Sequence, residues 1–258
     1  MMIWSESAPG KDAVTVTVPN TAALLDDLGR RFDTGTGFSV ATLNLDHVVK
    51  LTNDPDFQSA YTQHTHVTAD GHPIVWLSRL AGQKDISLVP GSELILPLAA
   101  LAAEKGVPIA FFGATDASLT KAAGALSARF PDLNIVTTLA PGAAFDPSDH
   151  EADAAIVKLA ASGARMVFVA LGAPKQECFV ARAQTAMPGA GFVSIGAGLD
   201  FIAGTQTRAP AWVRKIAAEW LWRLLGNPRR LARRYGACLR VVPALILRAL
   251  AHRRLRRA

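Results

Sequence analysis

A carboxylate followed by glycine, in Thr68-Ala-Asp70-Gly71, is the first place in this sequence where chemistry is expected. Asp70 follows a short apolar run, and the glycine permits a sharp turn or a close ligand approach. The alternative is structural, because His72-Pro73 begins a helical pattern that Asp70 could simply cap. Position alone therefore offers Asp70 either as a catalytic carboxylate or as a helix cap.

The second candidate is the turn Gly172-Ala-Pro174-Lys175-Gln176-Glu177, which follows the most continuous apolar run of the chain. Gly172 lets the backbone turn tightly, and free N–H groups at the start of the following helix can hold phosphate. Lys175 adds a positive charge, and Gln176 can both donate and accept hydrogen bonds. These features suit a nucleoside diphosphate, although an ordinary strand-to-helix turn with proline in the first helical turn would read the same way.

Two further glycine-containing turns follow apolar runs, at Gly113 and at Gly196-Ala-Gly198-Leu-Asp200. The second turn can approach a phosphate or a sugar, but it is not a G-x-G-x-x-G fingerprint. No P-loop or G-x-S-x-G pattern is present in the sequence.

Metal-binding patterns are weak in this chain. Asp54-Pro55-Asp56 matches the D-x-D pattern by which many sugar transferases hold a metal, but Asp before Pro at a helix start favours capping. His64 and His66 lack a third ligand at a recognisable spacing, and the two cysteines, Cys178 and Cys238, are far apart. These residues therefore do not predict a metal site.

Alternating short apolar runs and helical patterns must position these turns. The pattern predicts an α/β fold, a Rossmann-like, mostly parallel sheet flanked by helices. In such sheets ligands bind beyond the carboxyl ends of the strands, which is where the three turns and Asp70 fall. Strands are predicted at residues 38–43, 66–69, 108–112, 134–139, 165–171 and 191–195, helices at 116–129, at 149–162 and from Lys175, and a short β segment at 14–18.

The charge is distributed unevenly along the chain. From Arg208 onward there are 14 Lys or Arg and one acid, Glu219, a formal charge of +13, whereas residues 1–207 carry −7. A helix is predicted at residues 210–225, followed by a basic, apolar segment at 229–257 that Pro243 should kink or end. We therefore expect an α/β core at 1–205 and a basic helical membrane-docking appendage at 206–258. No signal peptide or spanning helix is expected.

Taken together, the order and spacing of the motifs resemble the WecG/TagA/CpsF family of glycosyltransferases (family 26) over about residues 42–235. The motifs that carry the resemblance are Thr42-Leu-Asn44, Ala69-Asp70-Gly71, Gly91-Ser92, Phe112-Gly113, Leu171-Gly-Ala-Pro-Lys-Gln-Glu177, Asp200-Phe-Ile-Ala-Gly204, Arg208-Ala-Pro210, Glu219-Trp-Leu-Trp-Arg223 and Arg233-Arg-Tyr235.

The resemblance implies an inverting transfer of a sugar from a UDP-sugar to a polyprenyl-diphosphate-linked saccharide, in the synthesis of a bacterial surface polysaccharide. It also implies that the reaction is metal-independent and needs no cofactor. The donor sugars found in the family are N-acetylmannosamine, its uronic acid and glucose. By the same resemblance, Asp70 is the base, and Thr42 and Asn44 lie beside it. The donor pocket would include Gly113, Gly172, Pro174, Lys175, Gln176, Glu177, Gly198 and Asp200, and the acceptor or membrane would meet Arg208, Arg214, Arg223, Arg230, Arg233 and Arg234.

This interpretation places the protein in the cytoplasm, peripherally on the inner face of the cytoplasmic membrane. Its expected partners are the UDP-sugar, the lipid-linked acceptor and anionic lipid, with no nucleic acid, and self-association is left open. One alternative is a nucleotide-binding α/β oxidoreductase, although a true phosphate fingerprint is missing. Another is a nucleic-acid binder that uses the basic tail, although no recognition motif is present.

Overall fold

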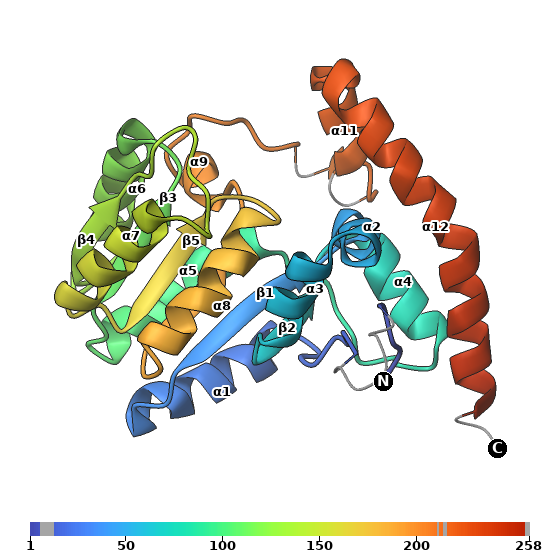
Figure 1. Ribbon diagram of the computed structural model, residues 1–258, viewed down its shortest axis with the longest axis horizontal. Helices are drawn as coiled ribbons and strands as arrows, with labels where there is room; N and C mark the ends of the chain where they lie inside the picture. Colours follow the sequence, from blue (N-terminus) through green and yellow to red (C-terminus); the bar gives the residue numbers. More distant parts are fainter. Residues whose placement is uncertain (6–12, 211, 214–215, 256–258) are drawn as a thin grey trace.

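Residues 1–5, 13–210, 212–213 and 216–255 are described by a computed structural model of the chain (Figure 1). Six strands in this part form one parallel sheet in the order β2-β1-β6-β5-β3-β4, which confirms the predicted fold class. Every residue of the five strands other than the edge strand β4 is buried, as expected of a sheet covered on both faces. The strands are β1 (Phe38–Leu43), β2 (His66–Ala69), β3 (Ile109–Gly113), β4 (Ile135–Leu139), β5 (Met166–Ala170) and β6 (Gly191–Ser194).

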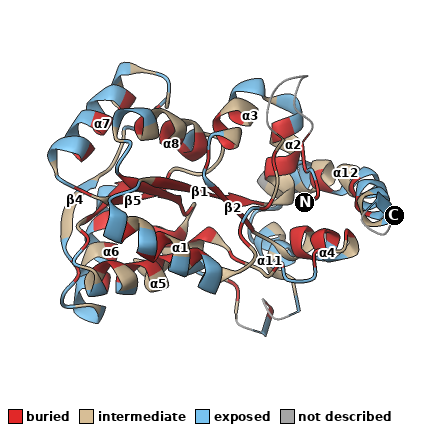
Figure 2. Cartoon of the chain, turned by 90° about the horizontal axis from the view of Figure 1, so that it is seen from below, coloured by how far each residue is buried: buried red, intermediate tan, exposed pale blue. Residues whose placement is uncertain are grey.

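Helices cover both faces of this sheet. Figure 2 shows α2, α3, α7 and α8 on one face and α1, α4, α5 and α6 on the other, with the buried strands between them. The predicted strands and helices of the core agree with the observed ones to within about two residues. The core helices are α1 (Thr21–Thr34), α2 (Leu45–Asn53), α3 (Pro55–Thr62), α4 (His72–Leu80), α5 (Gly91–Glu104), α6 (Asp116–Arg129), α7 (His150–Ala161), α8 (Lys175–Ala186) and α9 (Gly198–Ile202).

Large apolar side chains on the two sheet faces hold these layers together. On the α5 and α6 face, Phe111 and Phe168 lie in one buried cluster with their ring centroids 5.9 Å apart. On the α7 and α8 face, Phe112 stacks on Phe179 with a centroid separation of 4.3 Å. Since consecutive residues of β3 anchor opposite layers, the strand is fixed from both sides, and so is the turn that follows it.

The C-terminal appendage consists of α11 (Glu219–Gly226) and the long helix α12 (Pro228–Leu255). In Figure 1, α12 runs along the edge of the molecule beyond β2, and it packs against α2 and α4. Leu245 and Ala249 of α12 are buried in a cluster that includes Trp4 of the N-terminal segment and Ile74 of α4. The appendage is therefore seated on the core by apolar burial, while the proposed boundary between domains at residue 206 stays a prediction.

The structure corrects three sequence-based predictions of local structure. The helix predicted at residues 210–225 is not continuous: residues 212 and 213 are helical, but Ala217 has a left-handed backbone (φ 60°), and α11 begins only at Glu219. Pro243 neither ends nor divides α12, which continues through it for 28 residues in all. At residues 14–18 there is an isolated bridge between Ser5 and Val14 rather than a strand.

The apolar length of α12 was also underestimated. The sequence offers only interrupted apolar runs, but the continuous helix includes a stretch, Leu231–Leu255, that is long and apolar enough by length and composition to cross a membrane. The core helix of a soluble protein can pass the same test. Leu245 and Ala249 are nevertheless buried against the core, so α12 lies along the protein.

Gly113 should be the least replaceable glycine of the β3 turn. Its φ is 110°, and an added Cβ would lie 2.5 Å from the backbone of Ala170. We expect Gly113→Ala to lower the free energy of unfolding by about 2 kcal/mol or more, through strain and overpacking. The matched control is Gly124→Ala in α6, where the added methyl meets open space and should stabilise the helix by up to about 1 kcal/mol. Urea denaturation of both variants measures this difference, and equal effects would contradict it.

Candidate active site

Asp70 directly follows β2 and lies beside the end of β1. Its backbone N–H donates to Leu43 O at 2.7 Å, which extends the pairing of the two strands by one residue. Asn44, the residue after β1, donates from Nδ2 to Asp70 Oδ2 at 3.4 Å. The Oδ1 atom of the same amide caps α2 by accepting from His47 N, so the cap fixes which end of the amide faces Asp70. The structure thus brings together two of the three residues predicted to be catalytic.

The capping alternative for Asp70 is wrong. The cap position of α4 is Gly71, with φ 90°, and no side chain caps the first turn. The pKa of Asp70 is raised to about 6, mainly by burial; Asn44 and Arg223 act to lower it, and the nearby carboxylates Glu219 and Glu93 act to raise it. A carboxyl with that pKa is largely ionised at neutral pH but still basic enough to take up a proton.

Thr42, the third predicted catalytic residue, is buried within β1. It pairs in register with Thr68 of β2, and its methyl group lies against Gly91 at the start of α5. A side chain at Gly91 would also meet Ser194 O at 2.5 Å, so α5 approaches the β6 turn closely. Thr42 therefore lies within the sheet and supports the floor of the candidate site.

Gln176 joins two of the predicted donor-binding turns. Its Oε1 accepts from Gly172 N and from Gly196 N, each at 3.2 Å, so it connects the turn after β5 to the turn after β6. Its Nε2 donates to Glu177 Oε1 at 2.8 Å. Gln176 is itself buried, so the amide holds the protein's own backbone at the carboxyl edge of the sheet.

Lys175 and Pro174 lie at the start of α8, as predicted, but the lysine is already engaged. Lys175 Nζ donates to Phe145 O at 2.7 Å, in the connection between β4 and α7. Pro174 occupies the cap position of α8 rather than its first turn. The lysine therefore braces a neighbouring loop, a role that spacing could not indicate because Phe145 is 30 residues away.

Glu177 is fully buried, with no hydrogen-bond partner for Oε2 in the described part of the chain. Burial raises its pKa to about 7, against the lowering effects of Gln176 and Lys50. Burial raises the pKa of the Tyr61 hydroxyl, and the nearby charges of Glu177 and Asp70 contribute in the same direction. His47 Nδ1 lies 3.4 Å from that hydroxyl. These two aromatic residues form a buried polar layer behind the site that the sequence did not reveal.

Asp200 of α9 links α6 and the segment after α9 at the carboxyl edge of the sheet. Its Oδ1 accepts from Ser118 Oγ of α6 at 2.7 Å, and its Oδ2 accepts from Gln206 Nε2 at 3.0 Å. Gly198 allows α9 to pack closely, because a Cβ there would lie 2.4 Å from Ile95 Cδ1. With Gly113 at the end of β3, these residues complete an edge at which all the predicted donor residues lie at or just after strand ends.

Two of the six predicted arginines lie at this edge, Arg208 in the segment that follows α9 and Arg223 in α11. Arg208 and Arg223 lie over the ring of Phe201 in α9, with guanidinium carbons 5.8 and 6.0 Å from its centroid. Arg208 also pairs with Glu93 at 2.7 Å, and the charge of Arg223 lowers the pKa of Asp70. Both arginines thus lie together at Phe201, and the charge of Arg223 reaches Asp70 from 153 residues downstream in the chain.

The side chains of two of the other four arginines are described, and both belong to α12. Arg234 pairs with Asp46 of α2 at 2.8 Å, and Arg233 is exposed on α12. Arg214 and the side chain of Arg230 lie outside the described part of the structure.

In the described part of the chain, no group of three or more His, Cys, Asp or Glu side chains could hold a metal ion. Asp54 of the D-x-D pattern caps α3 by accepting from Phe57 N at 2.9 Å, as predicted. His64 and His66 turn to different partners, Ala60 O and Asp27 Oδ2, respectively.

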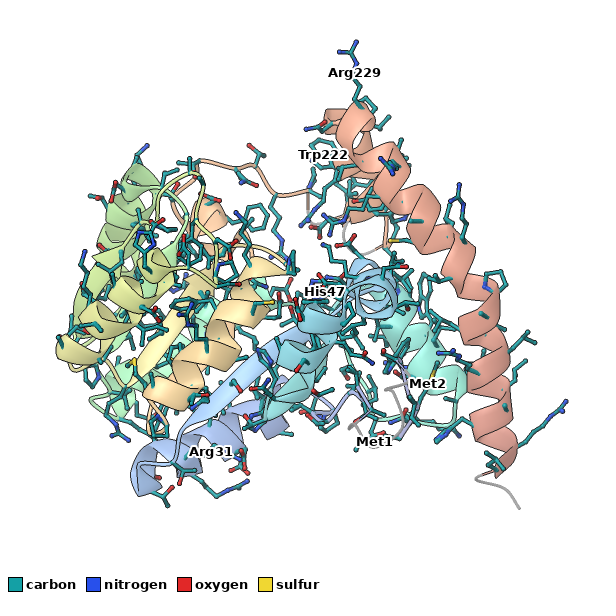
Figure 3. All side chains as sticks on the ribbon, viewed as in Figure 1. Met1, Met2, Arg31, His47, Trp222 and Arg229 are labelled. Atoms are coloured by element: carbon teal, nitrogen blue, oxygen red, sulfur yellow. The ribbon has the colours of Figure 1, made fainter. Side chains whose placement is uncertain are left out.

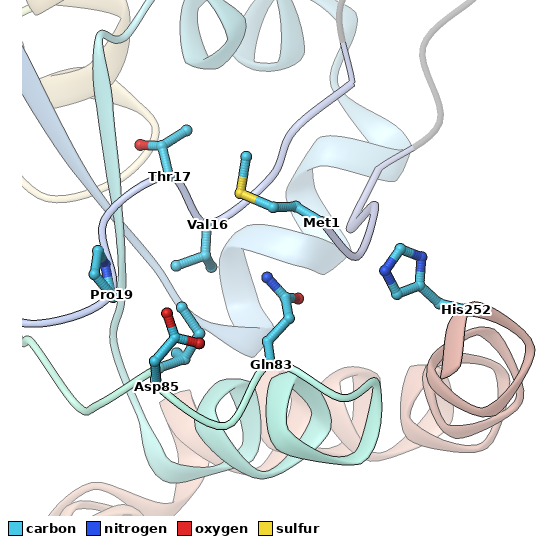
Figure 4. A pocket seen from close by; sticks show the side chains of 8 residues that line it. Met1, Val16, Thr17, Pro19, Gln83, Asp85 and His252 are labelled. Atoms are coloured by element: carbon cyan, nitrogen blue, oxygen red, sulfur yellow. The ribbon is translucent and has the colours of Figure 1, made fainter. Parts of the chain in front are cut away.

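Two cavities of about 330 Å³ lie away from the predicted residues. One is lined by Met1, Gln83, Asp85 and His252 among others (Figure 4), and the other by Asp27, Arg31 and His66 among others. Neither is lined by any residue of the predicted site, so the candidate site is the open carboxyl edge of the sheet rather than one of these cavities.

Comparison with known proteins agrees with this geometry. The protein-family model described as "Glycosyl transferase WecG/TagA/CpsF family" matches residues 13–258 of this chain. Two similar proteins are N-acetylglucosaminyldiphosphoundecaprenol N-acetyl-beta-D-mannosaminyltransferases. The one from Bacillus subtilis (strain 168) is 27% identical over 83% of this chain and 82% of its own length. The one from Bacillus spizizenii (strain ATCC 23059 / NRRL B-14472 / W23) is 29% identical over 86% and 82%. The oxidoreductase alternative is therefore wrong: this chain is a glycosyltransferase and belongs to the WecG/TagA/CpsF family.

Proposed function

We propose that this enzyme transfers N-acetylmannosamine from a UDP-sugar to N-acetylglucosamine carried on a polyprenyl diphosphate, with inversion at C1. The names of the two relatives support both the sugar and the acceptor. The observation that carries the proposal is Asp70, a carboxyl with a raised pKa that Asn44 holds at the carboxyl edge of the sheet. Such a group is suited to remove a proton from a sugar hydroxyl.

In the proposed reaction the acceptor hydroxyl oxygen bonds to C1 of the donor sugar, while the bond from C1 to the diphosphate oxygen breaks. The hydroxyl proton passes to Asp70, and UDP leaves with the bonding electrons. The negative charge that develops on the diphosphate needs nearby positive groups. Arg208 and Arg223 are the candidates, because both lie over Phe201 at this edge, where the diphosphate would replace their present partners Glu93 and Glu219.

We propose that the reaction needs no metal ion. Asp54 of the D-x-D pattern is committed to a helix cap, and two arginines at the edge can supply the charge that a metal would otherwise provide.

Asp70→Asn should lower kcat by about 100-fold or more, because the amide cannot accept the proton. The variant should fold at least as well as the parent, since the raised pKa means that the ionised carboxylate is disfavoured in the folded state. Steady-state transfer of sugar to lipid-diphosphate acceptor and thermal unfolding measure the two effects.

The matched control for this variant is Asp56→Asn, which removes the exposed carboxylate of the D-x-D pattern. Near-parental turnover is expected of it. A large loss in Asp56→Asn with little loss in Asp70→Asn would favour a metal-dependent reaction instead.

The pH dependence should report the same carboxyl. Because Asp70 acts when ionised and its pKa is about 6, kcat/KM should rise with pH through about 6 and level off above it. Initial rates at low donor concentration, from about pH 4.5 to 8.5, test this. A profile that is flat through pH 6, or that falls there as pH rises, would argue against Asp70 as the base.

We further propose that the appendage docks the enzyme on the inner face of the cytoplasmic membrane. Large apolar side chains are exposed on α11 and α12, among them Trp222, Leu239 and Leu247, and Figure 3 shows Arg229 extending outward at the start of α12. Basic residues beside exposed apolar surface suit anionic lipid, with roughly 1 kcal/mol for each basic residue near the headgroups. The apolar side chains favour lipid over nucleic acid as the partner.

Replacing Leu239 and Leu247 together by serine should weaken binding to vesicles that contain anionic lipid by at least about tenfold, because two exposed leucines no longer insert. The control is Val157→Ser on α7, equally exposed but on the core, which should bind as the parent does. Sedimentation with vesicles measures both. Unchanged vesicle binding, or stronger binding to DNA than to vesicles, would contradict the docking role.

A further inference from the structure

Helix α2 lies between the appendage and the candidate active site. Its cap, Asn44, donates to Asp70, while Asp46 lies in the first turn of the helix and Lys50 in its last turn. Figure 1 shows α2 next to α12, and Figure 3 shows His47 of α2 between the sheet and the appendage. One short helix therefore contacts both the catalytic carboxylate and the C-terminal helix.

Asp46 forms ion pairs with two cations, one from α12 and one from its own helix. Arg234 of α12 lies 2.8 Å from Asp46 Oδ2, and Lys50 lies 2.5 Å from the same oxygen. The Asp46 side chain is only 13% exposed, so both pairs are screened less by solvent than ordinary surface pairs. Without the carboxylate, the two cations would repel each other across the junction between α2 and α12.

Lys50 extends this connection to the turn after β5. Its Nζ also donates to Ala173 O at 3.2 Å, in the loop that leads from β5 to α8. The neighbouring Gly172 N–H is held by Gln176, which also holds Gly196 N after β6. Three consecutive polar contacts thus lead from α12 to the loop that carries the predicted donor-binding residues.

We propose that Arg234, Asp46 and Lys50 form an ionic relay through which the seating of α12 positions the β5–α8 loop for donor binding. In this role Asp46 and Lys50 are positioning residues, and Arg234 faces the core rather than the lipid or the acceptor. The inference rests on the proposed function only in taking the bound group to be a UDP-sugar. The linkage between α12 and the loop can be measured without any ligand.

The first experiment is hydrogen exchange on the ligand-free, full-length protein. Arg234→Gln, Asp46→Asn and Lys50→Met should each speed exchange in peptides that cover residues 172–177, because the Ala173 carbonyl loses its anchor. The matched control is Asp26→Asn, which breaks a similar i,i+4 pair with Arg30 on α1. Exchange at 172–177 that is unchanged in Lys50→Met and Arg234→Gln would overturn the relay, whether or not the protein binds UDP.

The second experiment separates positioning from general stability. Lys50→Met should raise the KM for UDP-N-acetylmannosamine by about fivefold or more, the lower end expected for coupled sites, with kcat within about twofold of the parent. Arg234→Gln should raise the donor KM less. The double variant should be no worse than Lys50→Met alone, because Arg234 acts through Lys50.

Effects on KM that multiply in the double variant would mean that Arg234 acts independently of Lys50, and would overturn the relay. If Asp46→Asn fails to fold, the Arg234 and Lys50 variants still decide the question. A parent enzyme that transfers no sugar from UDP-N-acetylmannosamine would contradict the proposed function instead, and the exchange experiment would then test the relay alone.

Discussion

The contact between Asn44 and Asp70 is the constraint on which the proposed chemistry depends. It exists because β1 and β2 are neighbouring parallel strands paired in register, so the residues that follow them emerge side by side. The amide is held by its role as the cap of α2, and the carboxylate is held by the backbone bond to Leu43. Burial then raises the pKa of Asp70, which makes a common carboxylate suitable as a base near neutral pH.

Around this pair, most polar side chains of the site hold the protein itself. Gln176 joins the turns after β5 and β6, Asp200 joins α6 and α9 to the segment that leads into the appendage, and Lys175 holds the β4–α7 connection. Such preorganised loops are expected where transition-state charge is to be stabilised without rearrangement. Arg223 of α11 is a cation whose charge acts on Asp70, so the attachment of the appendage to the core bears directly on the proposed chemistry.

The sequence was sufficient for the sheet and for the residues at its edge, because both follow from local patterns. The strand at Phe38–Leu43 was predicted to the residue, since a continuous apolar run in a covered sheet has few alternative structures. The start of α11 could not be predicted, because nothing in the residue types marks Ala217 as left-handed. The partners of Lys175 and Arg234 lie 30 and 188 residues away, so only the folded chain could reveal them.

The central claim is that the fold tunes Asp70 to act as a base. The most direct test is a titration of the Asp70 carboxyl carbon by ¹³C NMR in the full-length protein, with the signal assigned by its loss in Asp70→Asn. We predict a pKa of about 6 for Asp70 in the parent protein and a higher value in Asn44→Ala, because the hydrogen bond from Asn44 lowers the pKa. A titration midpoint near the ordinary value of 3.8, unchanged by Asn44→Ala, would contradict it.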